Sequence, residues 1–185
     1  IDPIELKPDD DLWNCWMAYR YNKITSLVKN VGKICRLNNT LFTVVIFPNR
    51  TTALDTKLQD WKTWSLNNFV DGFTPLFLTC DSTTTANLVE EVLKNKSNST
   101  KLYAGLFATF MNGSNADLIK QIHVSKQYNL DGVILFDYAH LNQNYISVLT
   151  QSAFKPGRND IIIQEEQCKS NNKTNKRKRV YRYGK

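Results

Sequence analysis

Two aspartates stand where acid–base chemistry could be carried out. Asp81 closely follows the apolar segment 69–78, and Asp137 directly follows the apolar segment 130–136. Hydrolysis of a glycosidic bond uses two carboxyl groups, one as an acid and the other as a base or nucleophile. No other carboxylate follows such a segment, so we expect these two to be the catalytic pair. The structural alternatives are a helix cap for each aspartate, or an ion pair between Asp137 and Arg50.

Four further residues follow segments of the same kind and could bind a substrate: Arg50, Asn112, Tyr138 and His140. His140 could act as a general base or polarise a hydroxyl group, although a loop histidine is often a packing residue. Phe77, Phe110 and Tyr138 could stack on sugar rings, and core packing is the alternative for both phenylalanines. The cysteines are far apart and include no Cys-x-x-Cys pair. The sequence therefore predicts no metal site and no cofactor.

The chain alternates between helical and strand-like segments. Five segments carry apolar residues at helical spacing and four are continuous apolar runs bounded by turn residues. The helical segments are 13–34, 55–67, 83–94, 115–128 and 142–154, and the strands are 41–47, 69–78, 101–110 and 130–136. Strict alternation predicts an α/β fold with right-handed crossovers and a parallel sheet buried on both faces. Four such strands form either a small open sheet or half of an eight-stranded TIM barrel, whose working residues lie beyond the strand ends.

A short motif occurs twice, about 60 residues apart. Residues 68–73 read Asn-Phe-Val-Asp-Gly-Phe, and residues 129–133 read Asn-Leu-Asp-Gly-Val. The interval is that of two βα units, as in a barrel or a doubly wound sheet. Asp71 and Asp131 precede a glycine at the start of a strand. We therefore interpret them as turn residues and not as catalytic ones.

The net charge of +7 comes from the end of the chain. Residues 1–154 contain 14 Lys+Arg and 14 Asp+Glu, whereas residues 155–185 contain 10 and 3, an excess of +7. We divide the chain into a βα domain (1–154) and a basic, flexible tail (155–185). The run 176–179 (Lys-Arg-Lys-Arg) in that tail could be attracted to a polyanionic surface, whereas the body carries no nucleic-acid signal. No apolar run approaches the roughly 18 to 20 residues that span a bilayer.

The most distinctive stretch joins a helix that ends in tryptophan to a strand. Residues 59–64 read Gln-Asp-Trp-Lys-Thr-Trp, and residues 67–76 read Asn-Asn-Phe-Val-Asp-Gly-Phe-Thr-Pro-Leu. Further segments fit the same pattern, namely 47–48 (Phe-Pro), 101–105 (Lys-Leu-Tyr-Ala-Gly), 118–127, and 131–136 (Asp-Gly-Val-Ile-Leu-Phe). Together they make residues 13–149 similar to the C-terminal half of the glycosyl-hydrolase-like family 10 barrel proteins.

The resemblance implies a fold, a function and a location. The four strands would be the fifth to eighth of a TIM barrel, and the first four, with the family's Gly-x-His-x-Asp-Tyr strand, would lie upstream of Ile1. The protein would be exported, extracellular or at the cell surface, and would act on a polysaccharide such as cell-wall glycan. One departure concerns the family's Asn-Pro-Met-x-Tyr strand end. Residues 74–78 read Thr-Pro-Leu-Phe-Leu instead, without the amide and the tyrosine that could contact sugar.

Three functions are open on these grounds. The first is hydrolysis of a polysaccharide by Asp81 and Asp137. The second is a non-catalytic carbohydrate-binding or scaffold barrel, which the altered strand end favours. The third is a small α/β domain that binds polyanions through its tail. Because a half barrel would leave the edges of the strands at Leu41 and Leu130 unpaired, we also expect this chain to self-associate or to be marginally stable.

Overall fold

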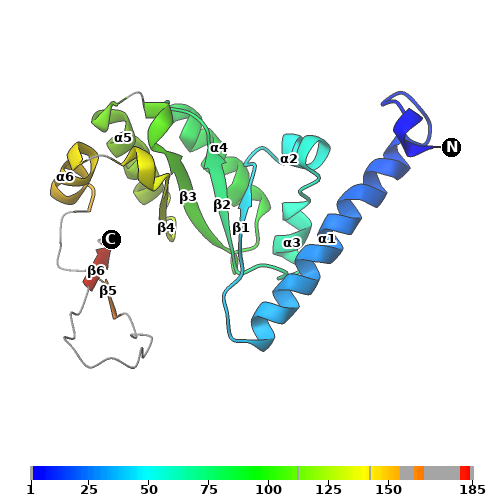
Figure 1. Ribbon diagram of the computed structural model, residues 1–185, viewed down its shortest axis with the longest axis horizontal. Helices are drawn as coiled ribbons and strands as arrows, with labels where there is room; N and C mark the ends of the chain where they lie inside the picture. Colours follow the sequence, from blue (N-terminus) through cyan, green and yellow to red (C-terminus); the bar gives the residue numbers. More distant parts are fainter. Residues whose placement is uncertain (1, 112, 142, 155–160, 165–179, 184–185) are drawn as a thin grey trace. The chain divides into compact units, whose positions relative to one another are not determined.

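The computed structural model describes residues 2–111, 113–141 and 143–154, and two short strands, 161–164 and 180–183. The chain divides into two compact units, residues 1–138 and 139–185. The first unit contains a parallel sheet, and the described residues of the second include the helix α6 and an antiparallel pair of strands (Figure 1). Asn112 and the basic run 176–179 lie outside the described residues.

The elements of the first unit confirm the predicted alternation. They are η1 (Pro3–Glu5), α1 (Trp13–Leu37), β1 (Thr43–Ile46), α2 (Arg50–Lys57), α3 (Trp61–Leu66), β2 (Gly72–Phe77), α4 (Ser82–Asn95), β3 (Lys101–Phe107), η2 (Ala108–Met111), α5 (Asn115–Gln127) and β4 (Gly132–Phe136). The turn η3 (Tyr138–His140) leads into the second unit, with α6 (Gln143–Gln151), β5 (Ile161–Gln164) and β6 (Val180–Tyr183). The prediction of a single helix over 55–67 was wrong. Leu58 adopts a left-handed conformation (φ 57°), which ends α2 before α3 begins.

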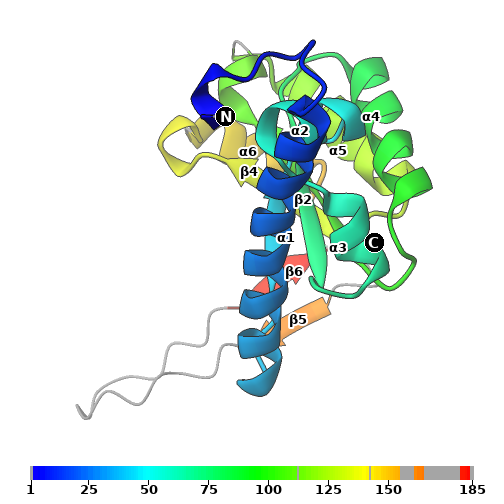
Figure 2. The ribbon, with the colours of Figure 1, turned by 90° about the vertical axis from the view of Figure 1, so that its right-hand side faces the viewer.

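The strands β1 to β4 form one sheet in the order in which they occur in the chain. All three pairings are parallel, and each crossover between neighbouring strands contains a helix. Figure 2 shows α4 and α5 on one side of the strands. A doubly wound sheet reverses its strand order at one point, whereas this sheet is wound in one direction. The α/β class with four parallel strands alternating with helices is therefore confirmed.

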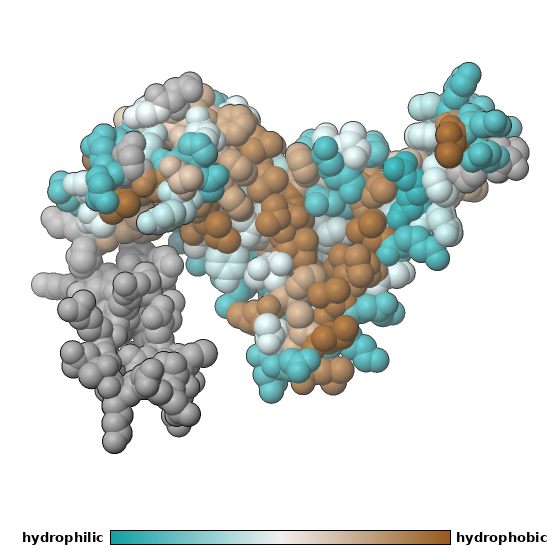
Figure 3. Space-filling view, in the orientation of Figure 1, coloured by the Kyte–Doolittle hydropathy of each residue, from teal (hydrophilic) through white to brown (hydrophobic). Residues whose placement is uncertain are grey.

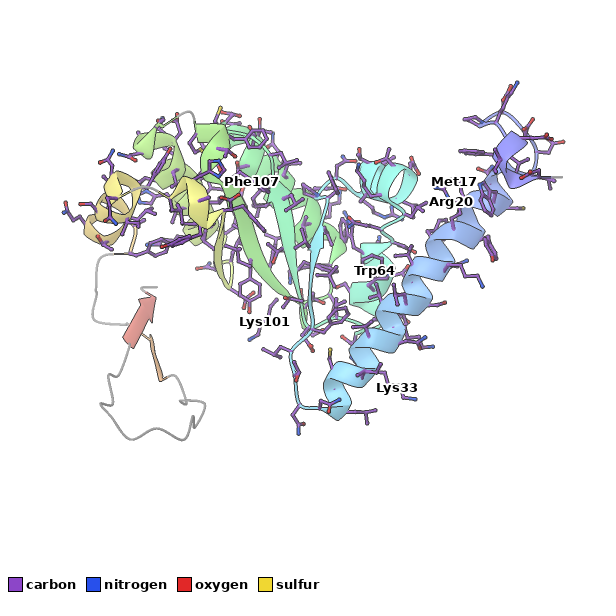
Figure 4. All side chains as sticks on the ribbon, in the orientation of Figure 1. Met17, Arg20, Lys33, Trp64, Lys101 and Phe107 are labelled. Atoms are coloured by element: carbon purple, nitrogen blue, oxygen red, sulfur yellow. The ribbon has the colours of Figure 1, made fainter. Side chains whose placement is uncertain are left out.

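Helices cover one face of the sheet. Ile46 and Phe73, from β1 and β2, belong to a buried cluster with Trp61 and Trp64 of α3. Trp64 donates a hydrogen bond from Nε1 to Thr25 Oγ1 at 2.8 Å, which fastens α3 to α1 (Figure 4). Large aromatic side chains contribute most of the apolar area in such a core. This cluster therefore holds α1, α3 and the first two strands together.

The repeated Asp-Gly motif has the same role in both copies. Asp71 accepts a hydrogen bond from the amide of Phe42 at 2.7 Å, and Asp131 accepts one from the amide of Leu102 at 2.8 Å. Each aspartate thus binds the backbone at the start of the neighbouring strand. The helices before β1, β2 and β4 each end near an asparagine with positive φ: Asn39, Asn68 and Asn129. The interpretation of the two aspartates as turn residues is confirmed.

The opposite face of the sheet keeps large apolar side chains partly exposed. This surface, called the open face below, comprises Val45, Tyr103, Phe107, Ile134 and Phe136. Val45 is 44% exposed and Ile134 is 39% exposed. Figure 3 shows hydrophobic residues gathered over these strands. The expected burial of the sheet on both faces is therefore met on one face alone within the described part of the chain.

Candidate functional site

Parallel strands end at one edge of a sheet, so the residues that follow them share that edge. Here those residues are 47–50 after β1, 78–81 after β2, 108–111 after β3 and 137–138 after β4. Gln121 of α5 is fully buried and donates a hydrogen bond to the carbonyl oxygen of Thr79 at 2.5 Å. This bond attaches the segment after β2 to α5. Loops held in this way on a rigid sheet suit binding or catalysis.

Asp81 is the N-cap of α4. One oxygen of its carboxylate accepts hydrogen bonds from the amide of Thr84 at 2.7 Å and from the Thr84 hydroxyl at 2.6 Å. These two bonds, the hydroxyl first, hold the pKa of Asp81 below its ordinary value. The structural interpretation of Asp81 is thus confirmed. Its carboxylate is ionised near neutral pH, which suits a base or nucleophile and does not suit a general acid.

Asp137 directly follows β4 and is exposed. Asp137 follows β4 and Asp81 follows β2. In the sheet, one strand, β3, lies between β2 and β4. Neighbouring strands lie about 4.8 Å apart, so the two strand ends are separated by roughly 9.6 Å. Carboxyl groups of inverting glycosidases lie roughly 6.5 to 9.5 Å apart. The separation of the two strands is close to the upper end of that range, and Asp137 lies one residue beyond β4 whereas Asp81 lies four residues beyond β2.

The expected binding residues occupy different parts of this edge. Arg50 is exposed and is the first residue of α2, which Asn49 caps by accepting a hydrogen bond from Thr52. Tyr138 is 87% exposed in the turn after β4. His140 lies at the end of that turn, in the second unit. The structure therefore places Arg50 and Tyr138 beyond the ends of β1 and β4 in the first unit.

The aromatic residues at this edge differ from the expected set. Phe77 is fully buried in the first unit, which is the core packing given as the alternative to stacking on sugar. Phe110 is 43% exposed and packs edge-to-face on Phe107, with ring centroids 5.8 Å apart. Phe107 stacks in turn on Phe136, with centroids 4.8 Å apart and ring planes at 14°. These three phenylalanines are called the aromatic cluster below.

Sequence reasoning missed Phe107, Phe136 and Gln121. Phe107 and Phe136 are opposite each other in the register of β3 and β4. Each is the last residue of its strand, which is the signal that could have identified them. Gln121 lies three residues after Leu118 on the buried face of α5. A polar residue on an apolar helix face marks a buried hydrogen bond.

The described residues contain no group of three or more His, Cys, Asp or Glu side chains placed to hold a metal ion. Within the same part of the chain, no helix has the length and apolar character required to cross a membrane.

Comparisons with known proteins identify no relative. No family model matches the chain, and neither the curated proteins nor the solved structures include a match. The assignment of a function therefore depends on the geometry of the sheet and on the residues at its carboxyl edge.

Proposed function

We propose that this chain is part of a glycoside-hydrolase-like β/α barrel that binds polysaccharide at its carboxyl edge and hydrolyses glycosidic bonds. The observation that carries the proposal is the aromatic cluster beside Asp137, at the end of a parallel sheet wound in one direction. The resemblance to the glycosyl-hydrolase-like family 10 proteins favours an exported protein at the cell surface or outside the cell. The following paragraphs give the support for each part.

The arrangement of the sheet supports half of an eight-stranded barrel. In such a barrel every strand pairs with its sequence neighbour, helices cover the outside, and side chains fill the inside. The order β1-β2-β3-β4 and the helix-covered face fit the first two requirements. The open face fits the third, because parallel sheets are normally covered on both faces. Four more strands would cover it and pair with both edges of the sheet.

The side chain of Gln59 sets a condition on barrel closure. Its amide accepts a hydrogen bond from the Phe47 amide at 2.9 Å and donates one to the Val45 carbonyl at 3.2 Å. Phe42 bonds toward β2, so the alternating residues Val45 and Phe47 point to the other edge of β1. Gln59 therefore occupies part of that edge. A preceding strand must displace Gln59 or pair with β1 nearer its amino end.

We infer different roles for the two aspartates from their surroundings. Asp81 is ionised by its bonds to Thr84 and suits the base or nucleophile. Asp137 lies next to the aromatic cluster, where a sugar ring could stack. An acid must protonate the leaving oxygen. That acid would be Asp137 or the upstream aspartate that the family resemblance implies.

Hydrolysis is tested by measuring the release of reducing ends from polysaccharides, including peptidoglycan glycan strands, by the full-length protein. Asp81→Asn and Asp137→Asn are compared with Asp55→Asn, an exposed aspartate of α2 away from the strand ends. We expect the first two variants to lose activity by at least about a hundredfold and the third to keep it. Unchanged activity in both would remove the two aspartates from the mechanism.

A non-catalytic carbohydrate-binding barrel is the second candidate. It is favoured by the role of Asp81 as a helix cap, which accounts for this residue without catalysis. It predicts retention of a polysaccharide in an affinity gel with no release of reducing ends. The third hypothesis, polyanion binding through the tail, rests on residues outside those that the structure describes.

A further inference from the structure

A basic helix with an exposed apolar stripe lies apart from the candidate site. The helix α1 contains five cationic residues and no acidic one: Arg20, Lys23, Lys29, Lys33 and Arg36. Its preceding residue Leu12 and four residues within it are exposed hydrophobic side chains: Tyr19 (54%), Leu27 (59%), Ile34 (59%) and Leu37 (74%), with Leu12 at 46%. The exposed stripe is unusual for a helix that packs on a sheet, because the outward face of such a helix is normally polar.

The exposed stripe lies opposite the packed side of α1. The packed side includes Thr25, which bonds to Trp64, and the buried residue Gly32, whose Cα approaches the backbone of Phe69. Leu27 comes two residues after Thr25, and Ile34 comes two residues after Gly32. Residues two apart on a helix point in nearly opposite directions. The apolar stripe is therefore directed away from the body of the first unit.

Two cations lie over two aromatic rings in the first half of this stripe. Trp16 and Tyr19 stack with ring centroids 5.6 Å apart. The Arg20 guanidinium lies over the Trp16 ring at 5.7 Å, and the Lys23 ammonium lies over the Tyr19 ring at 4.9 Å. Tryptophan and tyrosine concentrate at membrane–water interfaces, where an amphipathic ring contacts both phases. Lysine and arginine beside them attract anionic head groups.

We propose that α1 is an interfacial helix that binds the surface of an anionic lipid bilayer. Charge complementarity selects this partner: Arg20 and Lys23 lie beside the exposed leucine, isoleucine and tyrosine side chains, and α1 contains no acidic residue. Two other cations of α1 contact the body of the first unit instead, because Arg36 donates a hydrogen bond to the Asn68 carbonyl and Lys29 lies over the Phe69 ring. A helix of this kind lies in the plane of the membrane with its apolar side in the head-group region. It does not need the length or the apolar character of a spanning helix. The binding is independent of the polysaccharide site.

Binding is tested with the full chain and sedimented vesicles of phosphatidylglycerol and phosphatidylcholine, compared with vesicles of phosphatidylcholine alone. We expect binding to the anionic vesicles and a decrease as salt is raised, because head-group attraction is screened. Reversing two charges in Arg20→Glu/Lys23→Glu lowers the partition coefficient by about tenfold or more. The matched control Lys94→Glu/Lys120→Glu changes the net charge equally on α4 and α5 and keeps the wild-type partition coefficient.

A second pair of variants tests the apolar stripe. Leu27→Ser/Ile34→Ser is expected to weaken vesicle binding at least about fivefold, since two apolar side chains no longer enter the interface. Leu41→Ser/Leu66→Ser removes two equally exposed apolar residues elsewhere and keeps the binding. Brominated lipids should quench the fluorescence of Trp13 and Trp16, the two partly exposed tryptophans of α1, because Trp61 and Trp64 are buried. That quenching decreases in Trp16→Phe.

Two results would overturn the proposal. In the first, Lys176→Glu/Arg177→Glu abolishes vesicle binding while Arg20→Glu/Lys23→Glu leaves it unchanged, so that the tail alone carries it. In the second, Leu27→Ser/Ile34→Ser reduces self-association in sedimentation velocity and leaves vesicle binding unchanged. The stripe would then be an interface between copies of the chain.

Discussion

Asp71 and Phe42 exchange two hydrogen bonds across the amino edge of the sheet. The Asp71 carboxylate accepts from the Phe42 amide at 2.7 Å, and the Asp71 amide donates to the Phe42 carbonyl at 2.8 Å. Asp131 and Leu102 form the same pair of bonds, at 2.8 and 2.9 Å. The motif repeated in the sequence is therefore also repeated in the structure. In both copies an aspartate binds the start of the strand that pairs with its own.

Removing this carboxylate should destabilise the fold. In Asp71→Ala the amide of Phe42 loses its acceptor, and we expect the free energy of unfolding to fall by about 1 to 3 kcal/mol. Asp131→Ala should cost less, because Asp131 is more exposed and water can replace its carboxylate. Urea unfolding followed by circular dichroism measures both changes, with Asp55→Ala as the exposed control. Equal stability of Asp71→Ala and the control would contradict this role.

Gly32 allows α1 to approach the segment before β2. A Cβ atom at position 32 would lie 2.1 Å from the carbonyl oxygen of Phe69. Alanine favours helix over glycine by about 1 kcal/mol. This clash outweighs that preference, so Gly32→Ala should unfold at a lower temperature than the wild type. Asn30→Ala, at an exposed position of the same helix, is the control and should not be destabilised.

The sequence was sufficient for features that depend on local patterns. Alternating helices and strands, parallel pairing and the turn role of Asp71 all follow from residue spacing and turn chemistry. The break at Leu58 did not follow, because a leucine with positive φ has no sequence signal and is imposed by the surrounding structure.

The candidate site depended on strand register, which spacing does not determine. Phe107 and Phe136 meet because β3 and β4 pair in one particular register. Phe77 pairs with Leu106, which is one residue before Phe107 of the open face. Its side chain therefore lies on the other face of the sheet and points into the core. In a strand, a shift of one residue moves a side chain from one face to the other. Sequence reasoning therefore located the edge of the sheet and missed Phe107 and Phe136, two of the three phenylalanines of the aromatic cluster.

The pKa of Asp81 should respond to its neighbour Thr84. The Thr84 hydroxyl is the largest cause of the lowered pKa. Thr84→Val should therefore move the pKa of Asp81 upward, toward its ordinary value of 3.8. Titration of the carboxyl carbon by NMR measures this shift directly. Asp117, whose pKa is lowered through Ser114 and Lys120, should be unchanged and is the internal control.

The same residue contributes a pH dependence of stability. Because the folded pKa of Asp81 is below the unfolded value, its stabilising effect is present in full above pH 3.8. It is lost as the pH falls through the folded pKa. Asp81→Asn should therefore differ least from the wild type at the lowest pH. Thermal unfolding of both proteins at a series of pH values from about 2 to about 7, on both sides of the ordinary pKa, tests this expectation.

Phe110 is the most accessible member of the aromatic cluster. If polysaccharide binds there, Phe110→Ala should weaken binding by about 1 kcal/mol, the usual contribution of an aromatic pair beyond its buried area. Its stability should change little, because 43% of the side chain is exposed. Affinity electrophoresis in polysaccharide gels measures the change. Leu66→Ala, which removes an exposed side chain from α3, is the control, and equal retardation of the two variants would count against the cluster as a sugar site.

The open face should drive self-association of this chain. Val45 and Ile134 expose apolar surface on a parallel sheet whose second face lacks helices among the described residues. Light scattering of the 185-residue chain should therefore give a mass above that of the monomer, 21.4 kDa. Ile134→Lys places a charge in the middle of this face and should shift the distribution toward the monomer. Leu66→Lys adds the same charge on α3 and should leave the mass unchanged. A monomeric wild type would mean that the open face is stable in water, which favours a small open sheet over half of a barrel.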